Sequence, residues 1–568
     1  VLVPVYSPGR DIERCVASVL DQSLPPTDYE AIFVDDGSTD DTPARLDRLA
    51  MEHPHIRVIH IPNSGWPGKP RNVGVEQARG TFVQFVDQDD HLSREALERL
   101  VAMGDANGSD IVIGKVTSDF RGVPHGLFRK DRPACTIWDT SLIDSLTPHK
   151  MFRRSFLLAH GIRFPEGPYI LEDQLFMVRS YFRAKVVSIL ASYPCYFYNV
   201  RTEGTNTASR RMDPPTYYRN LRDVIEVVLA NTEPGDVRDR LLRRSYRVEM
   251  LGRLGEPWFP RQEPEFRTVL FRAIRELAMD HMNEAVHAGL SPLMRLRSTL
   301  LRADRPDELA ALATRATTIE ATVHLDRLAW SKGRLELAFR AGCTDRVRGE
   351  PIHLVRRGGR LYLDPYLTEG ILDAPFDVTD DLGSFRTEVS LRNVDDHVEW
   401  RLNDKRSVEF IDDGTDADGA TRLRPVIHVT AAIDPQTVAG GGPIGDGTWE
   451  IRTRVTFLGI DRRVTLAPSK GQALPPIAPG WLGRPARQVR PTADPDLGIR
   501  LEIGPGSLTD LAAAGSPEPA PSGGRASLVG LPVASAPGWT VPIMATVRPS
   551  ADATTTGART RGRPVRAR

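Results

Sequence analysis

Apolar residues follow two alternating patterns along the first two hundred positions. Short apolar runs such as "VLVPV" (1–5), "EAIFV" (30–34) and "TFVQFV" (81–86) are typical of buried strands. Between the runs, apolar residues recur every three or four positions, as in "DIERCVASVL" (11–20), which predicts helices. Strands that alternate with helices favour an α/β fold with a mostly parallel sheet between helical layers.

The pattern changes twice further along the chain. Helical spacing without intervening strands continues to about residue 317, and short alternating strands with glycine-containing turns follow it. Two stretches of about a hundred residues with this texture suit β-sandwich modules. We therefore expect an α/β domain at 1–212, a helical linker region at 213–317, β-sandwich modules at 318–423 and 424–550, and a basic disordered tail at 551–568.

Composition and charge narrow the class of partner and the cellular compartment that we expect. Lysine plus arginine equals aspartate plus glutamate at 74 each among 568 residues, so the overall charge indicates no nucleic-acid partner. Four scattered cysteines without a CxxC pair favour a reducing cytoplasm over a disulfide framework or a zinc site. No apolar run approaches the roughly 18 residues that cross a bilayer, and we expect no signal peptide. The chain starts inside a strand without methionine, so we expect a few native residues before Val1.

Only the end of the chain is one-sided in charge. The stretch "ARTRGRPVRAR" (558–568) carries five arginines and no acid. It is interpreted either as a solvated end or as a weak hold on an anionic polymer or an anionic lipid surface.

Polar clusters follow the predicted strands, where an open α/β sheet binds ligands. In "DQDD" (87–90), Asp87 and Asp89 stand two apart at the end of a strand, where their carboxylates can share one cation. Mg²⁺ and Mn²⁺ prefer such oxygen ligands, with substrate phosphates completing the shell. The alternative is a turn whose acids cap the helix that starts after residue 90. Three further polar loops favour the metal: "YSPGRD" (6–11), "DDGSTD" (35–40) and "NSGWPGKPRN" (63–72).

Two of these loops suggest a nucleotide. An aspartate in "VDDGSTD" (34–40) can accept the imide N–H of a uracil, although an ordinary Asx turn explains the same string. Lys69 and Arg71 stand at the predicted start of a helix, and both the helix terminus and the two cations favour a pyrophosphate. The alternative for that loop is plain surface structure.

Together, the stretches "VLVPVYSPGRDIERCVASVLDQS", "IFVDDGSTDDT", "PRNVGVEQARGTFVQFVDQDDHL" and "ILEDQLFM" resemble the family 2 glycosyltransferases, in order and spacing, over residues 1 to about 200. The resemblance implies a Rossmann-like GT-A fold and a divalent metal, Mn²⁺ or Mg²⁺, bound by the DXD motif. It also implies roles for single residues: Pro4 and Tyr6 flank the uracil, Asp36 (or the neighbouring Asp35) pairs with it, and Asn63 and Arg71 contact the nucleotide-sugar. Asp87 and Asp89 form the DXD motif, with Asp89 as the expected metal ligand.

The pair Glu172 and Asp173 completes the chemistry that the resemblance implies. An inverting transfer needs a base for the acceptor hydroxyl, and in this family the aspartate of an "ED" pair serves, so Asp173 is the expected base. Glu172 is expected to orient the base or the donor sugar. Taken alone, the pair is equally an acidic helix start favoured by the helix dipole.

Several residues are candidates for the acceptor side. Lys150 is expected to line it, whereas the neighbouring His149 fits a structural polar residue better. Arg201 and Thr205 are candidate donor or acceptor contacts near the phosphates, with loop solvation as the alternative. Arg210 and Arg211 are candidates for contact with an anionic acceptor.

The layout narrows the acceptor. The chain lacks the membrane helices and the QxxRW motif of processive polysaccharide synthases. A GT-A domain, a helical linker and tandem β-sandwiches are similar to the wall teichoic acid glycosyltransferases that add N-acetylglucosamine to poly(ribitol phosphate). That likeness implies a UDP-sugar donor, a polyol-phosphate acceptor, a homotrimer formed through the sandwiches, and a cytoplasmic enzyme that associates peripherally with the inner membrane face or with the polymer.

Three alternatives stay open. The acceptor could instead be a capsule or lipid-linked oligosaccharide. The protein could be a carbohydrate-binding scaffold with an inactive transferase domain, although the intact "DQDD" and "ED" argue against it. A sugar-phosphate nucleotidyltransferase would need a glycine-rich phosphate loop after the first strand, which "PVYSPGRD" does not supply.

Overall fold

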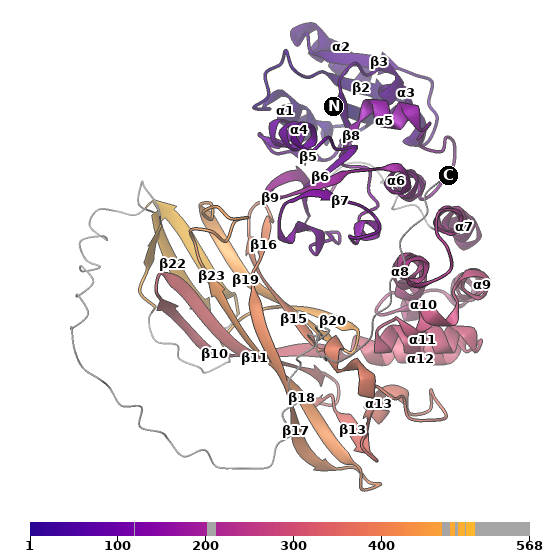
Figure 1. Cartoon of the computed structure of the whole chain (residues 1–568), viewed down its shortest axis with the longest axis vertical. Coiled ribbons are helices and arrows are strands. Elements are labelled where there is room, and N and C mark those ends of the chain that lie inside the picture. The colour runs from indigo at the N-terminus through magenta and orange to yellow at the C-terminus, as the bar shows by residue number, and fades with distance from the viewer. Residues whose placement is uncertain (119, 202–211, 469–476, 483–486, 495, 506–568) are drawn as a thin grey trace, which may run out of the picture.

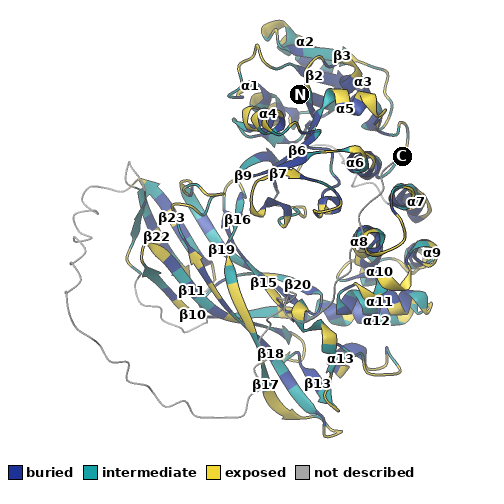
Figure 2. Cartoon of the chain, viewed as in Figure 1, coloured by how far each residue is buried: buried dark blue, intermediate teal, exposed yellow. Residues whose placement is uncertain are grey.

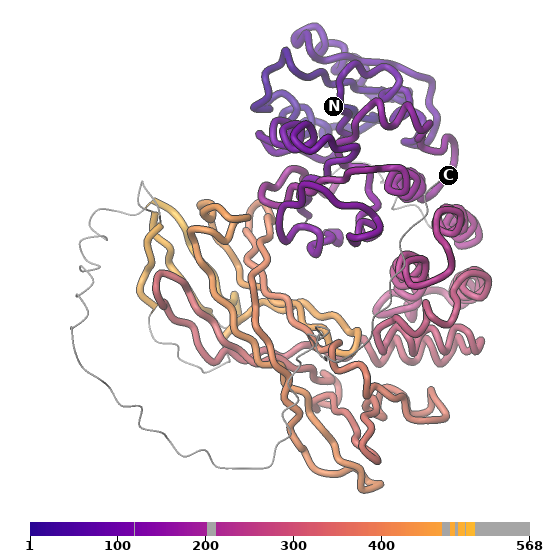
Figure 3. The backbone as a smooth tube through the Cα atoms, viewed as in Figure 1, coloured from indigo at the N-terminus to yellow at the C-terminus, as the bar shows by residue number. Residues whose placement is uncertain are grey.

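The computed structural model describes residues 1–118, 120–201, 212–468, 477–482, 487–494 and 496–505. An α/β domain, a group of helices and a region of long strands follow one another in chain order (Figure 1), and the backbone trace in Figure 3 shows the same succession. The predicted fold class, an α/β domain followed by a helical linker and an all-β region, is confirmed.

The N-terminal sheet has a parallel half and a mixed half. Parallel pairing joins β1, β2 and β3 in that order, and a parallel bridge from Leu2 to Phe85 connects β1 to the end of β4. The sheet continues in the order β4, β8, β6, β9 and β5, with β8 antiparallel to both neighbours and β7 paired with β9. The strands are β1 (Leu2–Val5), β2 (Ala31–Asp35), β3 (Ile56–His60), β4 (Phe82–Gln84), β5 (His91–Leu92), β6 (Ile111–Thr117), β7 (Arg132–Cys135), β8 (Met151–Arg153) and β9 (Val187–Phe197).

The helices of this domain follow the predicted spacing of apolar residues. In the first one, Ile12, Cys15 and Val19 are buried, as the three-and-four spacing requires. All five residues of β2 are buried, which fits a central strand covered on both faces. The helices are α1 (Ile12–Leu20), α2 (Thr42–Glu52), α3 (Gly68–Gln77), α4 (Ala96–Ala106), α5 (Arg154–Ala159) and α6 (Glu172–Arg183).

The linker region is helical, as predicted for 213–317. Four of its helices begin with proline, which suits a first turn because the missing N–H would have no intrahelical partner there. A π-helical turn, Tyr246–Met250, follows the second helix directly. The helices are α7 (Pro214–Ala230), α8 (Asp236–Ser245), α9 (Pro264–His281), α10 (Glu284–Ala288), α11 (Pro292–Arg302) and α12 (Pro306–Thr317).

Two seven-stranded sheets make up the β region. The first has the order β10, β11, β18, β13, β14, with β12 and β17 at its side, and the second has the order β16, β15, β19, β23, β22, β21, with β20 at its side. The strands are β10 (Ile319–Ser331), β11 (Arg334–Asp345), β12 (Glu350–Pro351), β13 (Leu354–Arg357), β14 (Arg360–Leu363), β15 (Arg386–Asn393), β16 (Glu399–Arg401), β17 (Asp404–Thr415), β18 (Thr421–Ile433), β19 (Gly447–Phe457), β20 (Ile460–Thr465), β21 (Gly480–Leu482), β22 (Arg487–Asp494) and β23 (Gly498–Pro505), with the short helix α13 (Pro365–Thr368) among them.

The strand pairing crosses the expected boundary between the two β modules. Residues 423 and 424 both lie inside β18, and that strand pairs with β11, β13 and β17 of the stretch before it. Conversely, β15 from that same earlier stretch pairs with β19. Each sheet therefore draws strands from both sides of residue 423, because alternation identifies strands but not their partners. Buried residues alternate with more exposed ones along β11, and Figure 2 shows the burial of the other strands.

Among the described residues, no helix combines the length and the apolar character that crossing a bilayer requires.

Candidate active site

The polar loops that follow β1, β2 and β4 are joined to one another. The Tyr6 amide donates to Gln88 Oε1 at 2.8 Å, and the Ser7 amide donates to Ser38 Oγ at 2.8 Å. The parallel strands β1 and β2 end side by side, so their loops meet at one edge of the sheet, as the sequence predicts. Gln88, between the two aspartates of the DXD motif, thus holds the loop that contains Tyr6.

Asp36 and Asp35 have different surroundings. Both carboxylate oxygens of Asp36 accept from Ser64, from its amide at 2.8 Å and from its hydroxyl at 2.9 Å, while Asn63 donates to the Asp36 carbonyl at 2.7 Å. The Asp35 carboxylate instead contacts Nδ1 of His60, at the end of the neighbouring strand β3, at 2.8 Å. Burial raises the pKa of Asp36. The geometry therefore ties Asp36 to Asn63 and the 63–72 loop, and contact of Asp36 with a nucleotide stays a prediction. Tyr6 is half exposed beside this loop, and Pro4 lies in β1.

Arg71 brings together the motifs at Asp87 and Glu172, which lie more than 80 residues apart in the sequence. Its Nη2 donates to Asp87 Oδ1 at 2.8 Å, and its Nη1 donates to Glu172 Oε1 at 3.2 Å. The side chain is only 5% exposed. Such a buried guanidinium with two carboxylates is a strong, directional arrangement. The "DQDD" and "ED" motifs therefore belong to one site.

Asp87, Asp90 and His149 form a compact cluster. One ligand atom from each lies within 4.8 Å of the other two, and His149 Nε2 is 2.9 Å from Asp87 Oδ2. Burial alone would raise the pKa of Asp87, but His149 and Arg71 outweigh it and hold that pKa well below its usual range. Burial raises the pKa of Asp90 well above its usual range, and the charges of the neighbouring aspartates add to this.

Asp89 lies in a different contact. Its Oδ2 accepts from Arg201 Nε at 2.8 Å, and it is not part of the cluster of Asp87, Asp90 and His149. Two carboxylates and an imidazole nitrogen are a donor set that suits Mn²⁺, and carboxylates suit Mg²⁺. The residues present thus fit a divalent ion, with Asp87 in the position that the sequence predicts. Metal ligation by Asp89 stays a prediction, and it requires Asp89 to exchange Arg201 for the ion.

The expected base lies at the start of α6. Leu171 precedes the helix with a φ of 68°, and Glu172 and Asp173 form its first turn. Asp173 Oδ1 accepts a hydrogen bond from the backbone N–H of Gln174 at 2.7 Å. Burial raises the pKa of Asp173, and burial together with the adjacent Asp173 charge raises the pKa of Glu172 to about 7. A carboxylate with a raised pKa is a stronger base than an exposed one.

The structure describes only some of the residues that are expected on the acceptor side. Lys150 is buried and its ammonium donates to the Thr147 carbonyl, and burial lowers its pKa to about 7. Its contact with an acceptor stays a prediction. Arg201 donates a hydrogen bond to Asp89, as described above. Thr205, Arg210 and Arg211 lie outside the described residues.

Sequence reasoning missed several residues of this site. The guanidinium of Arg121 stacks 4.3 Å from the centre of the Tyr198 ring, and its charge acts on the pKa values of Lys150 and Asp173. Tyr196 stacks on His149 and donates to Asp90 Oδ2 at 2.7 Å. The alternating aromatics of "CYFYN" (195–199) were the available signal, since alternate side chains of a strand share a face. His149, expected to be structural, lies against the DXD motif.

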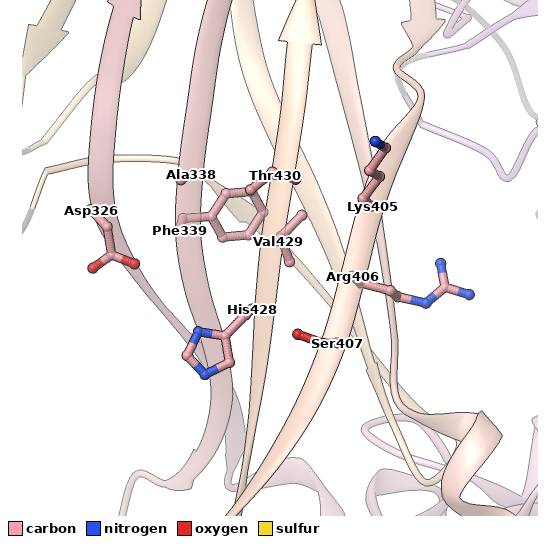
Figure 4. Close-up of a pocket in the computed structure, with 9 residues that line it drawn as sticks. All are labelled: Asp326, Ala338, Phe339, Lys405, Arg406, Ser407, His428, Val429 and Thr430. Atoms are coloured by element: carbon pink, nitrogen blue, oxygen red, sulfur yellow. The ribbon is translucent and has the colours of Figure 1, made fainter. Parts of the chain in front are cut away.

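A shallow pocket of about 290 Å³ lies elsewhere, on the first sheet of the β region (Figure 4). Asp326, its only carboxylate, is ion-paired with Arg340 at 2.9 Å. The other lining residues offer no cluster of metal ligands and no base comparable to the one at α6. They are Ala338, Phe339, Lys405, Arg406, Ser407, His428, Val429 and Thr430. The candidate site therefore stays in the α/β domain.

Comparison with known families agrees with this geometry. Residues 1–169 match the model of glycosyl transferase family 2, and residues 214–313 match that of the glycosyl transferase TarS linker domain.

Three relatives show how far the similarity extends. The poly(ribitol-phosphate) beta-glucosyltransferase of Bacillus spizizenii is 35% identical over 233 residues, 41% of this chain and 37% of the relative. The poly(ribitol-phosphate) beta-N-acetylglucosaminyltransferase TarS of Staphylococcus aureus is 35% identical over 236 residues, 41% of either chain. The poly(ribitol-phosphate) beta-N-acetylglucosaminyltransferase TarP of Staphylococcus aureus is 32% identical over 233 residues, 40% of this chain and 71% of the relative. The chain thus spans about two-fifths of the length of the first two relatives.

Proposed function

We propose that this chain, which belongs to the family 2 glycosyltransferases, moves a sugar from a UDP-sugar to a polyol-phosphate polymer such as wall teichoic acid. N-acetylglucosamine is the first choice of sugar. The observation that carries the proposal is the buried Arg71, which joins Asp87 of the DXD motif to Glu172 of the acid pair. This contact supports the proposal because it joins acidic side chains that suit a metal-bound diphosphate to a candidate base.

The donor is proposed to lie across the loops after β1, β2 and β4. Asp36, held by Ser64, accepts the imide N–H of the uracil, and Tyr6 and Pro4 flank the ring. Asn63 and Arg71 contact the nucleotide-sugar, and Lys69 adds positive charge beside the diphosphate at the start of α3.

Asp87 is proposed to hold a divalent ion, Mn²⁺ or Mg²⁺, with Asp89, Asp90 and His149 as the other candidate ligands. When bound, that ion offsets the charge that develops on the departing diphosphate.

Asp173 is proposed to take the proton from the acceptor hydroxyl as that oxygen attacks the anomeric carbon and UDP leaves, which inverts the configuration. Its raised pKa, caused by burial, supports this role. Glu172 keeps Arg71 in place through their 3.2 Å contact, so it orients the site rather than accepting the proton. A positioned base contributes roughly 10²–10⁴-fold to such a step.

The names of the relatives support the acceptor. All three act on poly(ribitol phosphate), two of them with N-acetylglucosamine and one with glucose, so both sugars belong in a first test. A capsule or lipid-linked oligosaccharide is the alternative acceptor, and an anionic polymer differs from it because salt competes with the polymer. The homotrimer, the cytoplasmic location, the peripheral association and a role for the basic tail stay predictions.

The test is a calorimetric or thermal-shift screen of the full chain with UDP-N-acetylglucosamine, UDP-glucose and UDP-galactose, each with Mn²⁺ and with EDTA. We expect one UDP-sugar to bind in the presence of the metal and to lose most of its affinity in EDTA. Addition of poly(ribitol phosphate) should then release UDP. Failure of every UDP-sugar to bind would overturn the proposal and favour the scaffold alternative.

A further inference from the structure

The first turn of α6 is bound to the linker helices by side chains. Gln174, which follows the proposed base, is 8% exposed, and both ends of its amide are hydrogen-bonded to linker residues. Its Nε2 donates to Glu249 Oε1 at 2.9 Å, and its Oε1 accepts from Arg244 Nη1 at 2.8 Å. A side-chain amide held at both ends has one rotamer and one orientation. The turn that contains Asp173 is therefore fixed from the side of the linker.

Glu249 is the centre of this contact. It is 5% exposed, lies 2.9 Å from Arg244 Nη1, and accepts from the Tyr217 hydroxyl at 2.6 Å. Burial alone would raise the pKa of Glu249, but Arg244 and these hydrogen bonds outweigh it and keep that pKa below its usual value. A buried carboxylate with this many partners resists displacement, because moving it would cost its 2.9 Å ion pair with Arg244 in a buried environment.

The backbone of the linker is shaped at this residue. Glu249 lies in the π-helical turn Tyr246–Met250 that follows α8. Each hydrogen bond of a π-helical turn spans five residues instead of the four of an α-helix. The side chains next to the turn therefore point in a different direction from the one that an uninterrupted α-helix would give them. Such turns occur often at functional sites. Here the irregular turn contains the carboxylate that holds Gln174.

The loop before α6 is held by the same region. Asn220 Nδ2 of α7 donates to the Ile170 carbonyl at 3.0 Å, and the Tyr169 hydroxyl donates to Asp223 Oδ2 at 2.5 Å. Leu171, next in the chain, has a φ of 68°, a conformation that side chains other than glycine adopt only under constraint. Contacts on both sides of this residue thus come from the linker.

We propose that Glu249 and Gln174 are positioning residues for the transfer step, and that the linker holds the turn of the catalytic base in its working orientation. The inference rests on the proposed function, with Asp173 as the base. The hydrogen bonds of Gln174 and Glu249 described above run to linker residues and not to the donor loops after β1, β2 and β4. The first turn of α6 meets the donor side through Glu172 and Arg71, so the linker positions the base while Arg71 keeps it coupled to the donor site.

The test uses the full chain with Mn²⁺, poly(ribitol phosphate) and the UDP-sugar that the wild type turns over. Gln174→Glu places a second carboxylate against Glu249, and Glu249→Gln removes the charge that pairs with Arg244. We expect each single change to lower kcat about 10- to 100-fold, the scale of a misplacement of about 1 Å, with the donor KM within about twofold of wild type. The double change Gln174→Glu with Glu249→Gln restores one carboxylate and one amide in exchanged places, and kcat should recover to within a few-fold of wild type.

Glu256→Gln is the matched control. Glu256 is another linker carboxylate, 12% exposed and ion-paired with the buried Arg297, and it has no contact with α6 among the described residues. The Glu256→Gln variant should lose about as much stability as the other two single variants, but its kcat should stay near that of wild type.

Each outcome has one meaning. Failure of the wild type to bind any UDP-sugar or to transfer it refutes the proposed function itself. Wild-type transfer with folded single variants of unchanged kcat refutes the inference alone. A parallel fall in kcat for the Glu256→Gln control, the absence of recovery in the double variant, or unfolding of both single variants would assign the network to stability and would also refute the inference.

Discussion

Asp173 is the proposed base and Asp89 is a candidate metal ligand, and single substitutions should separate these two proposed roles. Asp173→Asn removes the proposed base but keeps the size of the side chain and the hydrogen bond from the backbone N–H of Gln174. We expect UDP-sugar binding within about twofold of wild type and transfer lower by roughly 10²–10⁴-fold. Binding by calorimetry and UDP release with poly(ribitol phosphate) are the two measurements.

Asp89→Ala is the counterpart. It should abolish the metal-dependent part of UDP-sugar binding while the unfolding midpoint stays near that of wild type, because Asp89 contacts Arg201 near the surface of the site and not the core.

For the Asp173→Asn variant, transfer at the wild-type rate would show that another group is the base.

The pH dependence of transfer should reflect the buried acid pair. Burial raises the pKa of Glu172 to about 7 and also raises that of Asp173. As the pH falls through about 7, Glu172 takes a proton and weakens its contact with Arg71, and Asp173 then loses its basic form. We expect kcat to fall from pH 8 to pH 5, well above the range near 4 that an exposed carboxylate would give. Glu172→Gln should remove the inflection near 7, and a flat profile down to pH 5 would contradict the assignment.

Residues next to one another in sequence were predictable at this site, whereas contacts across the fold were not. Asp36, Arg71, Asp87 and the acid pair stand in short motifs at predicted strand and helix ends, and the resemblance to family 2 glycosyltransferases singled them out within those motifs. The position of His149 against Asp87 depends on β8 pairing with β4, a relation that no local pattern encodes. The partner of Asp89 was also invisible, since Arg201 lies 112 residues away in the chain.

At the scale of elements, the approach of α3 to the loop after α5 controls the position of Arg71. Gly68 starts this helix, and a Cβ built on it would lie 2.1 Å from the Pro165 carbonyl oxygen. Gly68→Ala must therefore move the helix or the loop. We expect a loss of about 1–3 kcal/mol in the free energy of unfolding and at least tenfold weaker UDP-sugar binding, because Lys69 and Arg71 move with the helix.

Gly383→Ala serves as the comparison for this change. A Cβ at Gly383 would meet no atom within 4 Å, so both quantities should stay near wild type. Donor binding by Gly68→Ala at wild-type strength would show that α3 does not place the nucleotide contacts.

Elements themselves were the most predictable level. The spacing of apolar residues identified α1 and the helical character of the linker region, because this signal is contained within each element. Strand partners were not contained in the same way. β18 lies between β11 and β13 of the first sheet although the sequence texture places a boundary inside it.

At the scale of the whole molecule, the α/β domain contacts the second β-sheet through a small buried interface. Lys115 Nζ of β6 lies 3.2 Å from the centre of the Trp400 ring on β16, and His125 Nε2 lies 3.7 Å from Glu399 on the same strand. Beside them, Arg392 donates to the Ser118 carbonyl at 3.5 Å. β6 continues to the segment that contains Arg121, so this interface adjoins the candidate site.

Lys115 gives this interface a dependence on pH. Burial lowers the pKa of Lys115 to about 7, whereas a lysine in the unfolded chain titrates near 10.4. The unfolded state therefore binds more protons between these values, and the stability of the folded protein rises as the pH increases from about 7 towards 10. Conversely, this contribution is lost as the pH falls through about 7.

Lys115→Met should remove that dependence, because methionine fills a similar volume without a charge to desolvate. We expect its unfolding midpoint to exceed that of wild type at pH 7 and the difference to shrink by pH 10, as followed by thermal unfolding at several pH values. Lys185→Met, at an exposed lysine, should leave the pH dependence unchanged. If Lys115→Met is less stable than wild type at pH 7, the cation–π contact with Trp400 outweighs the cost of burying the ammonium, and Lys115 then stabilises the interface in its charged form.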